Sequence, residues 1–292
     1  MIAVAKIRCS IISALFATVA SCYSSYTFAG ELPKAVSLDF CADQYLLAIA
    51  DPAQIIAVSK YATDENSFYR DRATGLKQYG GTVEEILMMK PDVVLGTDWS
   101  FMIQPALKNY GIETDTPQYG YETDILLKNL EHFGKVLHRN QQAEKIKSDY
   151  IARLSSLENL PKSDIRAAYI TPSGFTGGTG TYIDNIIKLA GFKSLAEENG
   201  TIDWQPLSLE KLLMNPPDLI ITSFFGQTDV EVSHWSLTRH PEIQKIMAEI
   251  PTVSIPSDMI SCGSLFSIEI ADYIHDEGEK ALQSKDRTRN GN

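Results

Sequence analysis

A stretch that occurs twice in the chain decides the fold. Residues Thr82 to Gly96 read TVEEILMMKPDVVLG, and residues Ser208 to Thr222 read SLEKLLMNPPDLIIT. Each copy opens with a hydroxyl side chain and an early glutamate, which favour the N-terminus of a short amphipathic helix. Pro-Asp then ends the helix, and an apolar run typical of a buried parallel strand follows. A repeat at this distance predicts two similar α/β lobes rather than a short-period solenoid.

The segments around the two copies continue the alternation of strands and helices. Short apolar runs alternate with helical patterns in both predicted lobes, which is typical of parallel α/β sheets. A helix is expected at residues 42–50. The expected strands are at residues 35–38, 55–59, 93–95 and near Ile112 in the first lobe, and at residues 166–170, 219–222 and 252–255 in the second.

A long helical stretch separates the two predicted lobes. Apolar residues recur at helical spacing from Thr123 to Leu160, and Pro161 closes the segment. We therefore expect a single long helix, and a rigid connector of this kind limits how far the lobes can close. The polar C-terminus predicts a disordered tail. The predicted boundaries are a first lobe at residues 30–122, a linking helix at 123–160, a second lobe at 161–283 and a tail at 284–292.

The N-terminus has the pattern of an export signal. Two basic residues precede an apolar run at residues 11–20, which is too short to span a bilayer. Small residues ending at Ala29 predict a signal peptide at residues 1–29 and a soluble periplasmic protein. The alternative is a lipobox ending at Cys22, which would leave a lipid-anchored protein.

Charge and cysteine usage narrow the function classes. The net charge of −11 argues against nucleic acid as the main partner. Beyond the signal region the cysteines are Cys41 and Cys262, and neither lies in a CxxC or HxxxH pattern that would predict zinc. In an oxidising compartment an isolated pair favours a disulfide. The alternative is two free thiols that bind a soft metal such as Cu(I).

Several segments in order carry a family resemblance. Residues 36–59 read VSLDFCADQYLLAIADPAQIIAVS, residues 174–192 read GFTGGTGTYIDNIIKLAGF, and residues 202–213 read IDWQPLSLEKLL. Together with the two repeats, they make the chain resemble the class III periplasmic binding proteins of cobalamin and ferric-siderophore ABC importers over nearly its whole mature length. The resemblance implies two Rossmann-like lobes joined by one long helix, with the ligand in the cleft between them.

The resemblance also implies a partner, the permease of an ABC importer. In the family, one glutamate per lobe at the start of the repeated helix meets arginines of the permease, and the matching positions are Glu84 and Glu210. A glutamate in the first turn also stabilises a helix by roughly 0.3–1 kcal/mol through the helix dipole. Its recurrence in both lobes favours docking, where such charge pairs chiefly set orientation and encounter rate.

The ligand cleft is expected where the strands end. Open α/β sheets bind ligands beyond the carboxyl ends of their strands, and aromatic planes there suit a large flat ligand, although core packing is an alternative role for them. Trp204 matches an aromatic position of the family, whereas Tyr79 is one residue out of register. Basic residues between Lys60 and Lys77 would suit an anionic chelate. The expected cleft residues are Cys41, Tyr61, Tyr79, Trp99, Phe175, Trp204, Phe224 and Cys262.

These observations predict a monomeric binding protein rather than an enzyme, without a resident cofactor or metal. The segment GFTGGTG at residues 174–180 misses the G-x-G-x-x-G spacing, and the sequence has no G-x-S-x-G or HExxH motif. The expected ligand is a metal chelate, either a corrinoid or a ferric siderophore. The alternatives are haem, a soft metal held by Cys41 and Cys262, and, last, an exported enzyme.

Overall fold

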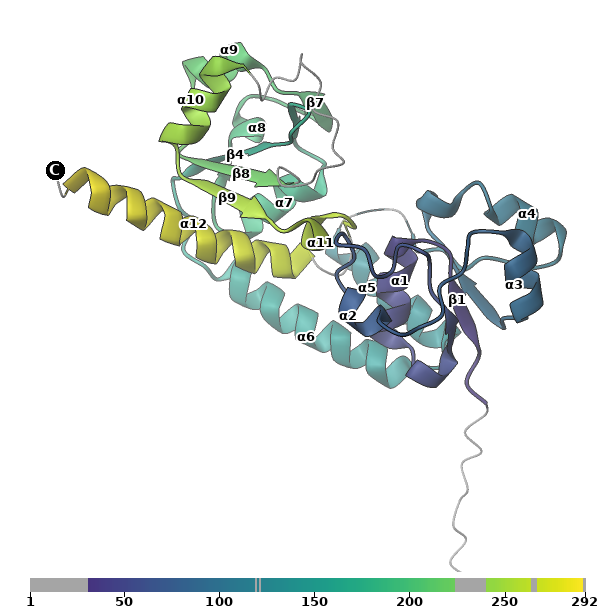
Figure 1. Ribbon diagram of the computed structural model, residues 1–292. Coiled ribbons are helices and arrows are strands. Elements are labelled where there is room, and N and C mark those ends of the chain that lie inside the picture. Colours follow the sequence, from purple (N-terminus) through teal and green to yellow (C-terminus); the bar gives the residue numbers. More distant parts are fainter. Residues whose placement is uncertain (1–30, 119, 121, 224–239, 264–266, 291–292) are drawn as a thin grey trace, which may run out of the picture. The chain divides into compact units, whose positions relative to one another are not determined.

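A computed structural model describes residues 31–118, 120, 122–223, 240–263 and 267–290 (Figure 1). Residues from Leu32 onward form one unit. The predicted signal peptide at residues 1–29, with the alternative processing sites at Ala29 and Cys22, lies outside the described residues. In the described part of the chain, no helix combines the length and the apolar character that crossing a membrane requires.

The first lobe contains a parallel sheet with the strand order β2-β1-β3. The strands are β1 (Ala35–Ser37), β2 (Ile55–Ala57) and β3 (Val93–Leu95), all of which the sequence predicted. The strand expected near Ile112 is wrong, because that segment makes only an isolated bridge between Leu95 and Asp115. The helices of this lobe are α1 (Phe40–Ile49), η1 (Pro52–Gln54), α2 (Arg70–Ala73), α3 (Val83–Met89), η2 (Asp98–Ser100) and α4 (Gln104–Asn109).

The second lobe contains a parallel sheet with the order β6-β4-β8-β9 and a separate antiparallel pair. The predicted strands are β4 (Arg166–Ile170), β8 (Leu219–Ser223) and β9 (Thr252–Ile255). The sequence did not predict β6 (Lys193–Ser194) or the pair β5 (Phe175–Gly177) and β7 (Trp204–Pro206). The helices are α7 (Tyr182–Leu189), α8 (Leu195–Glu198), α9 (Leu209–Met214), α10 (Pro241–Glu249), α11 (Ser257–Ile260) and α12 (Ser267–Asn290).

Both sheets carry helices on both faces, as a buried parallel sheet requires. Successive strand residues point to opposite faces. Ala35 packs in the cluster of α1 and α5, and its neighbour Val36 packs with Ile86 of α3. In β4, Tyr169 faces α7 and α12, while Ile170 faces α9 and α10. The chain therefore belongs to the predicted fold class, an α/β protein with two sheet-centred lobes.

The two repeats fold alike in detail. The hydroxyls of Thr82 and Ser208 cap α3 and α9, each accepting a hydrogen bond from the backbone N–H three residues on, at 3.3 Å. Asp92 accepts a hydrogen bond from the N–H of Lys34, just before β1, at 2.8 Å. Asp218 accepts the equivalent bond from the N–H of Arg166, the first residue of β4, at 2.9 Å. Pro-Asp thus both ends the helix and ties the following strand to its neighbour.

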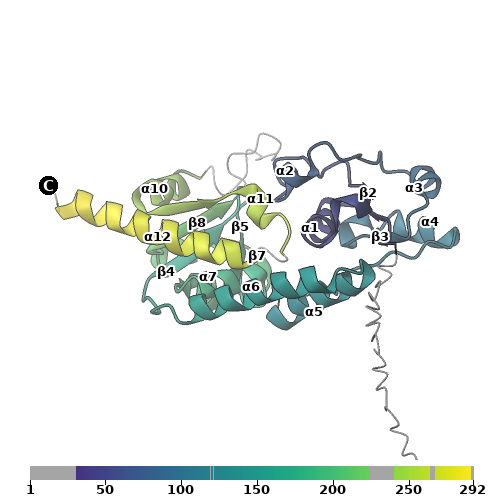
Figure 2. The same ribbon diagram turned by 90° about the horizontal axis from the view of Figure 1, so that it is seen from below.

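The predicted single linking helix is wrong in one respect, because the segment is two helices. Helices α5 (Thr123–Val136) and α6 (Asn140–Glu158) lie side by side (Figures 1 and 2). His138 adopts a left-handed backbone, φ 53°, and the N–H of Arg139 donates to the carbonyl of Gly134 at 2.7 Å. This is a Schellman ending, which stops α5 and turns the chain back. Gly134 permits the close approach, because a Cβ there would lie 2.5 Å from the Cβ of Ala143.

The predicted disordered tail at residues 284–292 is also wrong for most of its length. Helix α12 continues through Ser284 to Asn290. The sequence has no proline or glycine between Gly278 and Gly291, so no residue breaks the helix there. The helix is anchored by apolar contacts earlier along its length, where Ile270 and Ile274 are fully buried. A polar composition therefore predicted disorder where an anchored helix persists.

Candidate ligand-binding cleft

A cavity of about 590 Å³ lies beyond the carboxyl ends of β1, β3 and β4. This is the position at which parallel α/β sheets bind ligands. Both lobes and the connecting segment line it, and we refer to it as the cleft cavity. Its described lining residues are Phe40, Cys41, Tyr45, Thr97, Asp98, Trp99, Thr116, Pro117, Gln118, Gly120, Leu126, Asn129, Tyr169, Thr171, Tyr182, Trp204, Ile260, Ser261, Cys262 and Gly263.

Aromatic side chains line the cleft cavity in two groups, one from each lobe. In the first lobe, the ring centroids of Phe40 and Trp99 are 5.6 Å apart. In the second lobe, Trp204 packs edge-on against Tyr169 at 5.9 Å and lies 6.2 Å from Tyr182. Trp99 is 68% exposed and Trp204 is 41% exposed. Both indoles therefore have surface free for a further flat molecule.

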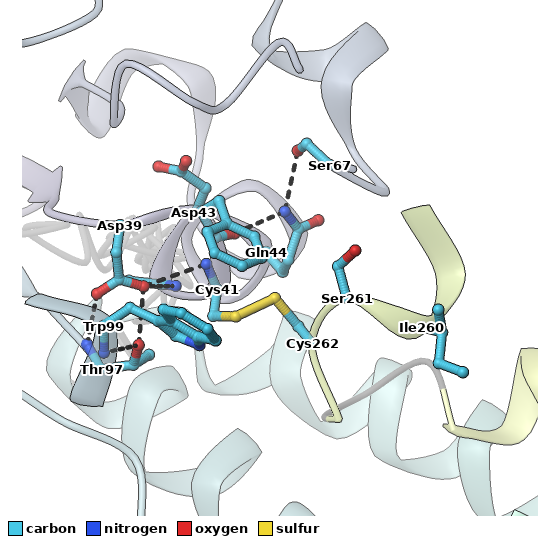
Figure 3. The surroundings of a disulfide bond; sticks show 12 residues. Asp39, Cys41, Asp43, Gln44, Ser67, Thr97, Trp99, Ile260, Ser261 and Cys262 are labelled. Carbon is cyan, nitrogen blue, oxygen red and sulfur yellow. Dashed lines mark hydrogen bonds between the residues drawn. A yellow bond between two sulfur atoms is a disulfide. The ribbon is translucent and has the colours of Figure 1, made fainter. Parts of the chain in front are cut away.

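The carboxylate of Asp39 joins the start of α1, which carries Cys41, to the segment after β3, which carries Trp99 (Figure 3). It caps α1 by accepting hydrogen bonds from the N–H groups of Cys41 at 3.1 Å and Ala42 at 2.9 Å. It also accepts from the N–H and the hydroxyl of Thr97, at 2.7 and 2.9 Å. One buried side chain thus joins the start of α1 to the loop after β3, which holds the first-lobe wall of the cavity in place.

A second buried carboxylate, Asp43, lies behind this wall in α1. It accepts hydrogen bonds from the hydroxyl of Ser37 and from the N–H and hydroxyl of Ser59, the latter two at 2.9 and 2.6 Å. Burial raises the pKa of Asp43 to about 7, against the lowering effect of those hydrogen bonds. Asp43 was not among the residues predicted to form the site. An acidic residue within the apolar helix run of residues 41–49 was the available signal.

Cys41 and Cys262 are joined by a disulfide, with an S–S distance of 2.08 Å and Cα atoms 5.6 Å apart (Figure 3). The bond ties the start of α1 to the segment after α11 and lines the cleft cavity. Nearby, the guanidinium of Arg70 contacts the carboxylate of Asp258 on α11 at 2.5 Å. The alternative in which two free thiols bind Cu(I) does not describe this state, because the sulfurs are bonded to each other.

The basic residues expected near the mouth of the first lobe do not line the cavity. Arg70 pairs with Asp258, as described above. The Lys60 ammonium lies over the ring of Tyr61, 4.9 Å from its centroid, and the Arg72 guanidinium lies 4.1 Å from that of Tyr69. Among the described lining residues Asp98 carries a charge, and the other polar groups are neutral. The amide of Asn129 exchanges hydrogen bonds with the backbone of Gln118, at 2.7 and 3.0 Å.

Four of the predicted cleft residues, Cys41, Trp99, Trp204 and Cys262, line the cavity. Tyr79 does not, because it is 4% exposed and its hydroxyl donates to the carbonyl of Leu38 at 2.6 Å. This corrects the expectation: Tyr79 is a core residue.

The remaining predicted cleft residues lie elsewhere. Tyr61 and Phe175 are 46% and 40% exposed and are absent from the described lining of the cavity. Phe224 lies outside the described residues. The sequence analysis did not select Tyr169 or Tyr182, although each occurs in a segment that it assigned to the second lobe. Selecting them would have required knowing which strand and helix residues face the first lobe.

The two glutamates expected to dock a permease occupy matching places. Glu84 lies in the first turn of α3 and Glu210 in the first turn of α9, and both are exposed. Neither lines the cleft cavity. Ligand binding and docking would therefore use separate surfaces of the same lobes.

A larger cavity of about 740 Å³ lies against α6 and α7 of the second lobe. Its walls include Lys188, whose ammonium is 2.7 Å from the buried carboxylate of Asp184 and 3.4 Å from Glu197. The charge of Lys188 is paired within the protein, and the cavity does not lie at the carboxyl ends of the strands. This cavity is the larger of the two. The cleft cavity, however, lies where parallel α/β sheets bind ligands and is lined by exposed aromatic side chains, so we assign the ligand site to the cleft cavity.

A model of the periplasmic binding protein family matches residues 36–254. The chain belongs to the periplasmic binding protein family. The predicted resemblance is confirmed, and this is a family of binding proteins whose members are periplasmic.

Individual relatives are distant. The chain is 22% identical over 206 residues to a cobalamin-binding protein of Halobacterium salinarum, covering 68% of this chain. The match spans only 56% of that relative's length.

Solved structures of the same fold cover more of the chain. The periplasmic heme-binding protein HutB of Vibrio cholerae is 20% identical, with a TM-score of 0.65, over 84% of this chain and 98% of its own. The periplasmic vitamin B12-binding protein BtuF of Vibrio cholerae is 17% identical, with a TM-score of 0.63, over 86% of this chain and 98% of its own. At these identities the similarity shows the fold.

Proposed function

We propose that this protein captures a corrinoid-type metal chelate in the periplasm and delivers it to the permease of an ABC importer. The observation that carries the proposal is the cleft cavity, where Trp99 of the first lobe and Trp204 of the second both line the space beyond the strand ends. Exposed indoles on two lobes suit a large flat ligand, because they bury much area with little loss of side-chain entropy.

The polar groups of the cavity favour a corrinoid among the chelates. A corrin ring carries amide groups at its edge, which both donate and accept hydrogen bonds. The cavity presents neutral partners for such groups, the amide of Gln118 and the hydroxyls of Thr116, Thr171 and Ser261. Amide-to-amide recognition of this kind fixes orientation without the cost of burying an unpaired charge.

Haem is the second candidate, because tyrosine hydroxyls line the same cavity and solved relatives of this fold include a heme-binding protein. Burial raises the pKa of Tyr169 to about 12 and raises the pKa of Tyr45 as well. Burial favours the neutral form of both phenols, and the hydroxyl of Tyr169 is already hydrogen-bonded to the hydroxyl of Ser223, which leaves it less free to ligate ferric iron. This chemistry supports the corrinoid over haem.

Delivery to the permease would use the exposed glutamates of α3 and α9. Glu84 and Glu210 occupy equivalent positions in the two repeats, one on each lobe. Their carboxylates suit basic groups on a partner, and such pairs steer encounter and orientation. We further propose export by the signal peptide at residues 1–29, with lipid anchoring at Cys22 as the alternative, and a monomer as the working form.

Tryptophan fluorescence tests the ligand assignment. In a Trp235→Phe background, the emission reports Trp99 and Trp204 alone. Titration with cyanocobalamin should give saturable quenching at sub-micromolar concentration, while haem and a panel of ferric siderophores should bind more weakly. Saturable binding of haem in preference to cyanocobalamin would replace the first candidate with the second. Folded protein that responds to none of these chelates would contradict the proposed function.

A further inference from the structure

The two repeats share an exposed methionine as well as an exposed glutamate. Met88 of α3 aligns with Met214 of α9, and the two side chains are 75% and 79% exposed. Each lies four residues after the glutamate of its helix, Glu84 or Glu210, so that glutamate and methionine lie on neighbouring turns of one helix face. We call each pair, Glu84 with Met88 and Glu210 with Met214, a docking pair.

Packing gives the two docking pairs the same orientation on their lobes. Ile86 and Leu212, which align in the repeats, are 0% and 2% exposed and pack against the outer faces of their sheets. The position just before each methionine is partly or largely exposed, with Leu213 at 44%. The core therefore takes one side of each helix, and the docking pair faces away from it.

We propose that Met88 and Met214 are apolar anchors for the permease and that the permease presents one matching site, a basic group beside an apolar pocket, to each lobe. This inference rests on the proposed function and deepens its docking surface. The negative charge of Glu84 and Glu210 suits a basic group on the partner. The presence of one docking pair on each lobe suits a partner with two equivalent sites, such as a two-fold symmetric pair of membrane subunits. Methionine suits the pocket because its unbranched, polarizable side chain adapts to an irregular apolar surface.

The glutamates and the methionines are expected to affect different rate constants of docking. Exposed charge pairs at the rim of an interface mainly raise the association rate. An apolar side chain that enters a pocket on the partner mainly slows dissociation. Glutamate substitutions should therefore weaken docking and make it less sensitive to salt, whereas methionine substitutions should leave its salt dependence unchanged.

The corrinoid importer of the source cell, its permease together with its ATPase subunits, is reconstituted in nanodiscs. The test measures the concentration of binding protein that gives half-maximal stimulation of ATP hydrolysis by this importer. Met88→Gln and Met214→Gln should each raise that concentration about 5–10-fold, by amounts equal within about twofold, and the double variant about 25-fold or more. Met88→Leu and Met214→Leu should stay near wild type. The matched control is Met102→Gln, since Met102 is 81% exposed but lies outside both repeats, and it should have no effect.

The affinity for cyanocobalamin, measured by fluorescence on the same variants, should be unchanged. A double methionine variant that docks like wild type, while Glu84→Ala with Glu210→Ala does not dock, would overturn the anchors and leave the proposed function intact. An effect of Met102→Gln as large as that of Met88→Gln would also overturn them. Wild-type protein that binds cyanocobalamin but never stimulates the permease would overturn the docking role itself.

Discussion

The two lobes are built on the same helix–Pro-Asp–strand unit but place different residues ahead of it. In the second lobe, Trp204 lies in β7, which pairs with β5, and three residues separate it from the capping Ser208. In the first lobe, two glycines separate Tyr79 from Thr82, and Tyr79 is buried. The repeat therefore specifies the helix, the turn and the strand, while the preceding residues decide whether an aromatic side chain reaches the cleft.

Each lobe has a buried aspartate in a helix that packs on its sheet, and the two lobes stabilise this aspartate differently. Asp43 of α1 is surrounded by the hydroxyls of Ser37 and Ser59 and one backbone N–H. Asp184 of α7 lies 2.7 Å from the ammonium of Lys188. The first lobe thus keeps its acid by hydrogen bonding alone, and the second keeps it with a countercharge. The first solution is sensitive to protonation.

The largest expected effect comes from breaking the covalent tie between the lobes. The double variant Cys41→Ser with Cys262→Ser should lower the free energy of unfolding by about 2–5 kcal/mol, because the disulfide closes a loop across a sequence separation of 221 residues. Urea denaturation followed by circular dichroism measures it. Wild-type protein kept in reductant is the control and should unfold at the same urea concentration as the variant. Equal stability with and without the bond would contradict the expectation.

The next effect follows from the buried acid of the first lobe. Because the pKa of Asp43 is about 7 in the folded protein and 3.8 ordinarily, the folded state binds the proton more tightly. The stabilisation of the folded state by protonated Asp43 is fully present below about pH 4 and is lost as the pH rises through 7. Each unit of difference between the folded and unfolded pKa corresponds to roughly 1.4 kcal/mol of unfolding free energy. Asp43→Asn should flatten the profile of unfolding free energy between pH 4 and pH 8. A profile parallel to that of wild type would contradict the assignment.

The aromatic difference between the lobes predicts opposite outcomes for two substitutions. Trp204→Ala should weaken cyanocobalamin binding about tenfold or more, because it removes a half-exposed plane from the cleft cavity. Tyr79→Phe should leave binding unchanged and cost about 1 kcal/mol of stability, through the lost hydrogen bond to Leu38. Fluorescence titration and urea denaturation of both variants separate the two. A loss of cyanocobalamin binding in the Tyr79→Phe variant would show instead that Tyr79 contributes to the cleft.

The smallest effect compares the Pro-Asp turns. Asp92→Ala should cost about 1 kcal/mol, the value of one hydrogen bond to the N–H of Lys34. Asp218→Ala should cost about 1–2 kcal/mol, because Asp218 also contacts the guanidinium of Arg166 at 3.3 Å. Thermal unfolding of the two variants tests the order. A larger loss for Asp92 would show that the repeats are less alike than their backbone hydrogen bonds indicate.

Sequence patterns determined the parts of this protein that depend on neighbours along the chain. The repeat alone indicated two lobes, the caps at Thr82 and Ser208, and the matching places of Glu84 and Glu210. Hydrophobic runs located most strands of the two parallel sheets. These features depend on periodicity, capping and Pro-Asp turns, which act over a few residues and can be read directly from a sequence.

Only the tertiary structure decided the features that depend on distant partners. The bond between Asp39 and Thr97 spans 58 positions, and the burial of Tyr79 depends on the carbonyl of Leu38, 41 positions away. The break in the linking helix combines a local left-handed turn at His138 with the close packing of Gly134 on Ala143. Such contacts are set by how the sheets and helices pack, because a side chain that is free to turn toward the cleft or the core takes the side where its polar atoms find partners.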